Sequence, residues 1–124
     1  EILKRKIAFD TDPEGFIEKW REEQEKLAKR ILQAREALKA IEINEEMLEK
    51  IVKLTIELEL DGHRGDIVII KTARALAAYY QKEEITLDEI RIAAKFALNH
   101  RIKKLPFEET EEKKMKLLQA LGKL

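Results

Sequence analysis

One segment of the chain combines residue types that could contact an anion. In Asp61-Gly62-His63-Arg64-Gly65-Asp66, an arginine stands between two glycines, where one apolar periodic stretch ends and another begins. A planar guanidinium fits phosphate oxygens better than an ammonium group does. A helix that begins here would add free N–H groups and partial positive charge on the same side. From these residues alone, a surface arginine after a helix-stopping glycine remains the simpler interpretation of Arg64.

No other motif in the sequence predicts catalysis or metal binding. There is no GxxxxGK[ST] phosphate loop, no HExxH, no GxSxG and no Rossmann glycine pattern. The absence of cysteine excludes disulfides, thiolate zinc sites and cysteine nucleophiles. His63 and His100 have no partner at metal-ligand spacing, so we expect surface or packing roles. Paired glutamates lie among lysines at helical spacing, which is typical of a solvated helix surface. Trp20, Tyr79 and Tyr80 are expected in the core or an interface.

Composition limits the classes of partner. The chain has 124 residues, the size of one compact domain with a single core. Its 25 Lys and Arg balance 25 Asp and Glu, and this net charge of zero argues against a nucleic-acid partner. No apolar run approaches the ~20 residues that span a bilayer, and no signal peptide is visible, so no membrane partner is expected. We therefore predict a cytoplasmic protein. Glutamate at position 1 indicates an excised segment or a processed start.

Glycine and proline mark the boundaries of the elements that would position the arginine, because the chain has only 4 glycines and 2 prolines. Asp12-Pro13 predicts a helix N-terminus, and the helix should continue to about Ala40. Its apolar positions form one stripe: Phe16, Trp20, Leu27, Ile31, Ala34 and Leu38. Residues 41–43 should form an extended connector. Asn44 can then cap a second helix, which should stop before Asp61-Gly62.

A third helix is expected from the Arg64 segment to about Tyr80, and its alanines would allow close approach to a neighbouring helix. Val68-Ile69-Ile70 could instead form a strand, but the glycine before it and the alanine-rich stretch after it favour helix. Thr86 and Glu89 match a capping box and predict a fourth helix to about residue 104, ended by Pro106. The fold class is therefore all-α, a bundle of four main helices with a possible short fifth helix near the C-terminus.

At the arginine segment the sequence resembles a known family. DGHRGDIVIIKTARALAAYY, residues 61–80, is similar to a stretch of the ATPase (I) subunit of magnesium chelatase, in which a D-G-x-R-G-[DE] junction opens a helix rich in alanine and arginine. Residues 100–108 resemble the H-R-x-R-x-P ending of this family. RKIAFDTDPEGFIEKW, residues 5–20, resembles the segment between its AAA+ core and its helical lid. The resemblance covers about residues 4–109.

The resemblance implies a role for the arginine. In this family the lid packs beside the ATP site and supplies the sensor 2 arginine, which touches the terminal phosphates of the nucleotide. The matching position is Arg64, with Gly65 and Asp66 shaping the start of the helix. Lys71, where the family usually has arginine, and Arg74 match further basic positions. His100 and Arg101 match the ending motif and are as well explained by structural roles.

The resemblance also implies a division of the chain and a set of partners. Residues 1–12 would link a missing AAA+ core to the lid, residues 13–109 would form the lid, and residues 110–124 would be a C-terminal helical extension. ATP and Mg²⁺ would be bound in the parent protein but not by the isolated domain, whose own sequence lacks Walker motifs. The partners would be the core, neighbouring subunits of a ring and chelatase subunits. A free-standing helical protein-interaction module without nucleotide function is the alternative, and a nucleic-acid-binding helical domain is a third possibility.

Overall fold

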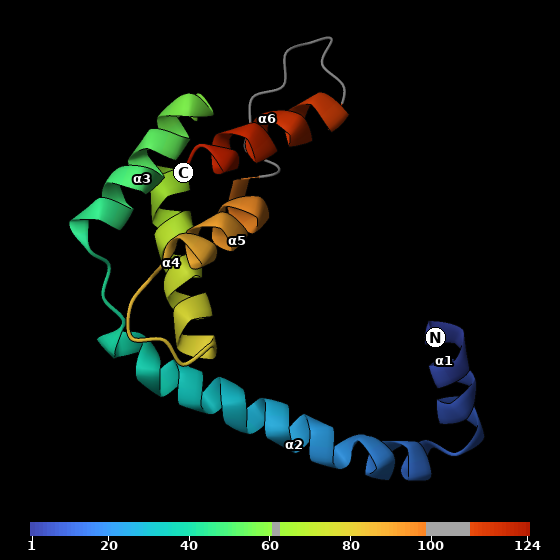
Figure 1. The fold of residues 1–124 in the computed structure, drawn as a ribbon. Coiled ribbons are helices and arrows are strands. Elements are labelled where there is room, and N and C mark those ends of the chain that lie inside the picture. The colour runs from blue at the N-terminus through green and yellow to red at the C-terminus, as the bar shows by residue number, and fades with distance from the viewer. Residues whose placement is uncertain (61–62, 99–109) are drawn as a thin grey trace. The chain divides into compact units, whose positions relative to one another are not determined.

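The computed structural model describes residues 1–60, 63–98 and 110–124, and it confirms an all-helical architecture (Figure 1). The elements, in chain order, are α1 (Ile2–Thr11), α2 (Pro13–Ala37), the 3₁₀ turn η1 (Leu38–Ala40), α3 (Glu45–Glu57), α4 (Arg64–Tyr79), α5 (Leu87–Leu98) and α6 (Thr110–Gly122). Within the described ranges there are six α-helices where the sequence predicted four or five, because the N-terminal residues expected in a linker form α1. In this part of the chain, the β interactions are limited to one bridge between Glu42 and Glu84.

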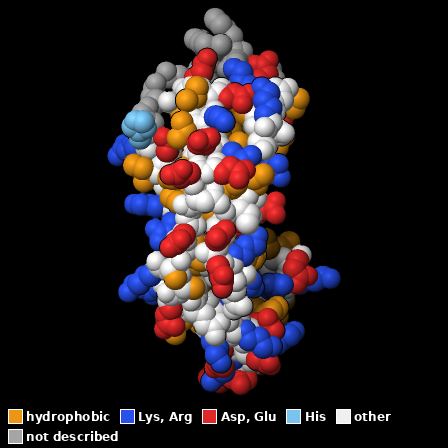
Figure 2. Space-filling model, turned by 60° about the vertical axis from the view of Figure 1, so that its left-hand side comes forward, with side chains coloured by type: hydrophobic (Ala, Val, Ile, Leu, Met, Phe, Trp, Pro, Cys, Tyr) orange, Lys and Arg blue, Asp and Glu red, His pale blue; other side chains and the backbone are white. Residues whose placement is uncertain are grey.

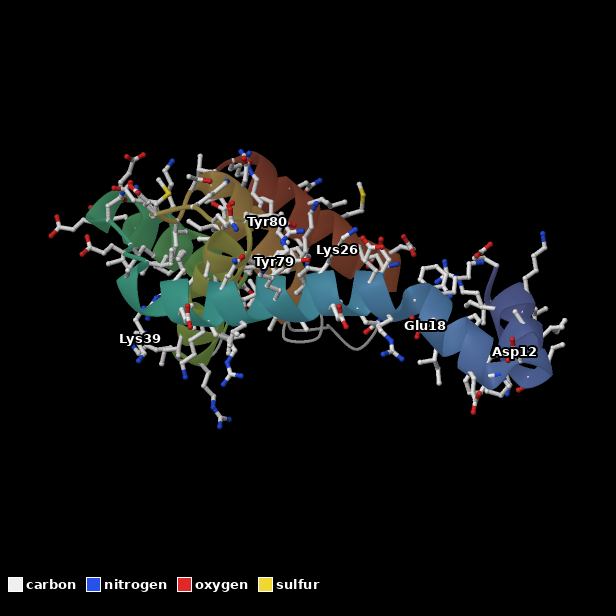
Figure 3. All side chains as sticks on the ribbon, turned by 90° about the horizontal axis from the view of Figure 1, so that it is seen from below. Asp12, Glu18, Lys26, Lys39, Tyr79 and Tyr80 are labelled. Carbon is white, nitrogen blue, oxygen red and sulfur yellow. The ribbon has the colours of Figure 1, made fainter. Side chains whose placement is uncertain are left out.

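The chain forms two compact units, residues 1–33 and 34–124, and the division falls inside α2. In the first unit, α1 packs on the start of α2 through aromatic contacts. The Phe9 and Phe16 rings meet edge to face at 5.8 Å, and the Arg5 guanidinium lies 4.7 Å from the Trp20 ring centroid. Asp12, labelled in Figure 3, caps α2 as predicted, since its Oδ1 accepts a hydrogen bond from the Gly15 N–H at 3.1 Å.

The second unit contains the hydrophobic core. Its largest fully buried apolar side chains come from α3, α4, α5 and the loop before α5: Ile51, Leu54, Ile69, Ile85, Ile90 and Leu98. The buried face of α4 includes Ala73 and Ala77, which allow α5 to approach closely. The sequence predicted such an approach by a neighbouring helix without identifying which one. Leu117 and Leu121 bring α6 into the same core. The last helical stretch of the chain is therefore part of the packed unit.

The predicted helix starts in this unit are confirmed. The Asn44 Oδ1 accepts a hydrogen bond from the Met47 N–H at 2.9 Å, so Asn44 is the N-cap of α3. One half of the predicted Thr86–Glu89 capping box forms before α5, since the Thr86 N–H donates to Glu89 Oε2 at 2.9 Å, while the Thr86 hydroxyl donates to the same carboxylate oxygen. The alternative of a strand at residues 68–70 is wrong, because these residues lie within α4.

Two helices end on residues that the sequence did not single out. Glu59 after α3 and Gln81 after α4 both have positive φ, 51° and 57°. The following N–H groups turn back into the helices: Leu60 donates to the Thr55 carbonyl at 3.1 Å and Lys82 to the Ala77 carbonyl at 2.8 Å. Both are Schellman-type ends, in which glycine is the usual left-handed residue. The predicted stop at Asp61-Gly62 and the end of the fourth helix at Pro106 lie outside the described residues.

Candidate functional site

The start of α4 is held close to its neighbours at a position that has no side chain. Gly65 is buried, and a Cβ atom there would meet Leu60 Cδ1 at 3.0 Å, Leu98 Cδ2 at 3.6 Å and Thr55 Cγ2 at 3.8 Å. These atoms belong to the end of α3, the segment after it and the end of α5. Gly65 therefore lets three segments meet at the first turn of α4. That this residue shapes the helix start for the function of Arg64 stays a prediction.

Arg64 is the first residue of α4, and its side chain is exposed. His63, the residue before it, makes no side-chain capping hydrogen bond to the helix. The His63 Nδ1 instead lies 3.2 Å from Asp66 Oδ2, while Asp66 Oδ1 is buried without a hydrogen-bond partner among the described atoms. The Asp66 carboxylate compensates part of the positive end of the helix dipole. Arg64 thus supplies the outward-facing positive charge of this turn.

The other basic positions of α4 differ in their surroundings. Lys71 is exposed and follows Arg64 by seven residues, which places both on one face of the helix. Arg74 is half-buried, and its Nη2 donates a hydrogen bond to the Leu38 carbonyl of η1 at 3.0 Å. The Arg74 Nε is buried without a partner among the described residues. The guanidinium of Arg74 therefore ties α4 to η1. His100 and Arg101 lie outside the described residues.

A charged network at the start of α5 includes a residue that the sequence did not suggest. Glu89 is 1% exposed, and its carboxylate accepts hydrogen bonds from Lys82 Nζ at 2.6 Å, the Thr86 N–H at 2.9 Å and Thr86 Oγ1 at 2.5 Å. The capping-box motif identified Thr86 and Glu89, but Lys82 lies in the loop after α4 and carries no sequence signal for this role. Its contact depends on the left-handed turn at Gln81.

The network changes the pKa of both charged partners. Burial by itself would raise the pKa of Glu89, but the hydrogen bonds from Lys82 and Thr86 together hold this pKa below its usual value. The hydrogen bond to Glu89 raises the pKa of Lys82, against a smaller opposing effect of desolvation. Both groups are therefore charged at neutral pH. The network joins Lys82, in the loop after α4, to Glu89 in the first turn of α5. The two helices are also packed against each other.

The surface carries both acidic and basic side chains. On the face shown in Figure 2, acidic and basic side chains are interspersed, with hydrophobic side chains between them. Among the described residues, no group of three His, Asp or Glu side chains is arranged to hold a metal ion. None of the described helices is both long enough and apolar enough to cross a membrane. Arg64 at the start of α4 is the exposed residue to which the family resemblance, rather than the residue pattern alone, assigns a contact with phosphate.

Comparison with protein families gives a direct match over the helices around this residue. A model of the AAA lid domain matches residues 48–120, from α3 into α6. The chain belongs to the AAA lid domain family. The matched range includes the helix start with Arg64, and most of the core of the lid.

Sequence similarity to individual proteins shows which type of AAA lid this is. The chain is 43% identical over 122 residues to a magnesium-chelatase subunit ChlI homolog of Methanocaldococcus jannaschii, covering 98% of this chain and 33% of that protein. It is 38% identical to the magnesium-chelatase 38 kDa subunit of Chlorobaculum tepidum and 39% identical to subunit ChlI-2 of Arabidopsis thaliana. Both matches cover 90% of this chain, and 28% and 27% of the relatives. The lid is therefore of the magnesium-chelatase AAA+ type, and the chain spans about a third or less of these relatives.

Proposed function

We propose that this lid contributes Arg64 to the ATP site of a magnesium-chelatase-like AAA+ subunit. The observation that carries the proposal is the exposed position of Arg64 in the first turn of α4. The guanidinium can reach beyond the lid surface toward phosphate oxygens bound by an AAA+ core. ATP and Mg²⁺ are the ligands of that core in this proposal. The isolated lid binds neither.

The contact would couple hydrolysis to movement of the lid. A guanidinium that meets the terminal phosphate binds more strongly to the ATP state than to the ADP state, so the two nucleotides favour different lid positions. In a ring of such subunits, this difference would drive metal insertion or remodelling by a partner subunit. The core, the neighbouring subunits and chelatase partners are all part of the proposal. The match to the AAA lid domain supports a core, and the similarity to subunits of magnesium chelatase supports chelatase partners.

The test measures ATP hydrolysis and nucleotide affinity of the full-length subunit with Arg64→Ala. We expect hydrolysis to fall roughly tenfold to hundredfold, because a positioned donor to the reacting phosphate is lost. Arg64→Lys keeps the charge but loses the planar fork, so it should restore hydrolysis only in part. Arg91→Ala, on α5, is the matched control and should leave both quantities unchanged. Normal hydrolysis and normal affinity in Arg64→Ala would exclude the proposed contact.

A further inference from the structure

Arg74 reaches from α4 to the end of the helical stretch formed by α2 and η1. Its Nη2 donates a hydrogen bond to the Leu38 carbonyl at 3.0 Å, and η1 packs against α4 (Figure 1). The last four carbonyls of a helix lack N–H partners further along the chain, and they carry the negative end of the helix dipole. Leu38 is one of the residues at this end. A cation on a different helix therefore caps α2 and η1.

The apolar contacts at this end of α2 are made mainly by small side chains. Ala34, Ala37 and Leu38 are partly buried and pack against the core of the second unit. Two of the three are alanines, which bury little apolar area, and α2 contains no fully buried residue. Hydrophobic burial alone therefore fixes this helix end weakly. The hydrogen bond from Arg74 joins a charged donor to a carbonyl, and it adds both strength and direction to the contact.

The same helix carries Arg74 and Arg64, which lie about 15 Å apart along its axis. Along the chain, the end of α2 is connected to α4 through η1, the connector after it, α3 and the segment that follows α3. The hydrogen bond of Arg74 provides a direct connection between η1 and α4. The other end of α4 is held by the contacts around Gly65. The end of α2 is thus joined to the helix whose first residue is Arg64.

We propose that Arg74 is a positioning residue, which fixes the direction in which α2 leaves the lid relative to α4. Its effect on hydrolysis rests on the proposed function of Arg64. In the parent subunit, the residues before α2 are proposed to join the lid to the AAA+ core. An α2 that is held firmly at η1 then limits the positions that Arg64 can take at the ATP site. Such placement affects the reacting transition state more than the binding of substrate.

Double electron–electron resonance between two spin labels tests the direction of α2 in the 124-residue chain. The chain has no cysteine, so Lys29→Cys on α2 and Lys53→Cys on α3, both at exposed positions, can be labelled specifically. Lys29 lies roughly 13 Å from Leu38 along the same helix, so a change in the direction of α2 displaces its label measurably. We expect a narrow distribution of label distances in the chain that retains Arg74.

The distribution should become at least about twofold wider in Arg74→Met, which keeps the length of the side chain but removes its charge and its donors. Arg74→Gln, whose amide is too short to reach η1, should widen it in the same way. Arg74→Lys retains a charged donor on a shorter side chain and should give an intermediate width. Arg91→Met is the matched control, because Arg91 is a half-buried arginine on α5, and it should leave the width unchanged.

A residue that only stabilises the lid would lower the free energy of unfolding without widening the distribution. An unchanged width in Arg74→Met would therefore overturn the proposal, as would equal widening in Arg91→Met. Circular dichroism verifies that each variant is folded. If Arg74→Met does not fold, Arg74→Gln takes its place, and an unchanged width in that variant would overturn the proposal in the same way.

ATP hydrolysis by the full-length subunit tests the link to Arg64. Arg74→Met should lower kcat about tenfold and change KM less than twofold, and Arg74→Lys should recover part of kcat. Normal hydrolysis in Arg74→Met beside impaired hydrolysis in Arg64→Ala would overturn the link between the two arginines. Normal hydrolysis in both variants would contradict the proposed function of Arg64 instead, and the label distances would then decide the role of Arg74.

Discussion

Replacing Glu89 by glutamine should destabilise the lid by about 2 kcal/mol at pH 7. The carboxylate is 1% exposed and accepts three hydrogen bonds, from Lys82 and from two groups of Thr86. In Glu89→Gln, the amide oxygen can still face Thr86, but the amide nitrogen then faces the Lys82 ammonium, donor against donor. One charge-assisted hydrogen bond is lost, and such bonds contribute about 1.5–3 kcal/mol. Urea denaturation followed by circular dichroism measures the difference.

The pH dependence gives this prediction a second, independent measurement. The folded pKa of Glu89 lies below its unfolded value of about 4.3, so the unfolded chain binds more protons between these two values. The stability contributed by Glu89 is therefore complete above about pH 5 and is lost as the pH falls through the folded pKa. The gap between the unmodified chain and Glu89→Gln should narrow below about pH 4.

A matched control separates the network from a general effect of surface charge. Glu83→Gln changes an exposed glutamate in the same loop and should alter the free energy of unfolding by less than about 0.5 kcal/mol. Equal stability of Glu89→Gln and the unmodified chain at pH 7 would refute the argument. A gap that stays constant down to pH 3 would show that the lost stability does not come from the ionised carboxylate.

Two further substitutions test the backbone at the helix ends. Gln81→Gly should raise the free energy of unfolding by up to about 1 kcal/mol, because Gln81 has a φ of 57° that glycine adopts without steric cost; a decrease in urea denaturation would contradict this. Gly65→Val should lower it by about 1–3 kcal/mol, since the added methyl groups extend from a Cβ already 3.0 Å from Leu60 Cδ1; unchanged stability would show that α4 can move away without cost.

Helix starts could be predicted from the sequence because their signals are local. Asp12, Asn44 and Thr86 each accept or share hydrogen bonds with groups three residues away, so the motif contains both partners. Helix ends were harder to predict from the sequence. The sequence directed attention to glycine, whereas Glu59 and Gln81 adopt the left-handed conformation here. This conformation lets the N–H groups of Leu60 and Lys82 donate to carbonyls five residues earlier, and the residue types of Glu59 and Gln81 do not indicate it.

The candidate site shows the same contrast between local and distant partners. The resemblance implied a special helix start at Gly65, and the structure shows that a Cβ atom there would lie close to side chains of three segments. The role of Arg74 could not be predicted, because its acceptor is the Leu38 carbonyl, 36 positions away in the chain. Lys82 and Glu89 are likewise joined by a turn whose geometry only the folded chain reveals.

The missing side chain at Gly65 has a mechanical consequence. Contact with the end of α3 and the end of α5 leaves the backbone beside Arg64 little room to swing independently. If Arg64 contacts a nucleotide as proposed, a displacement of its guanidinium would be transmitted through the first turn of α4 to α3 and α5 as well. The three helices would then move together, without a hinge at the start of α4.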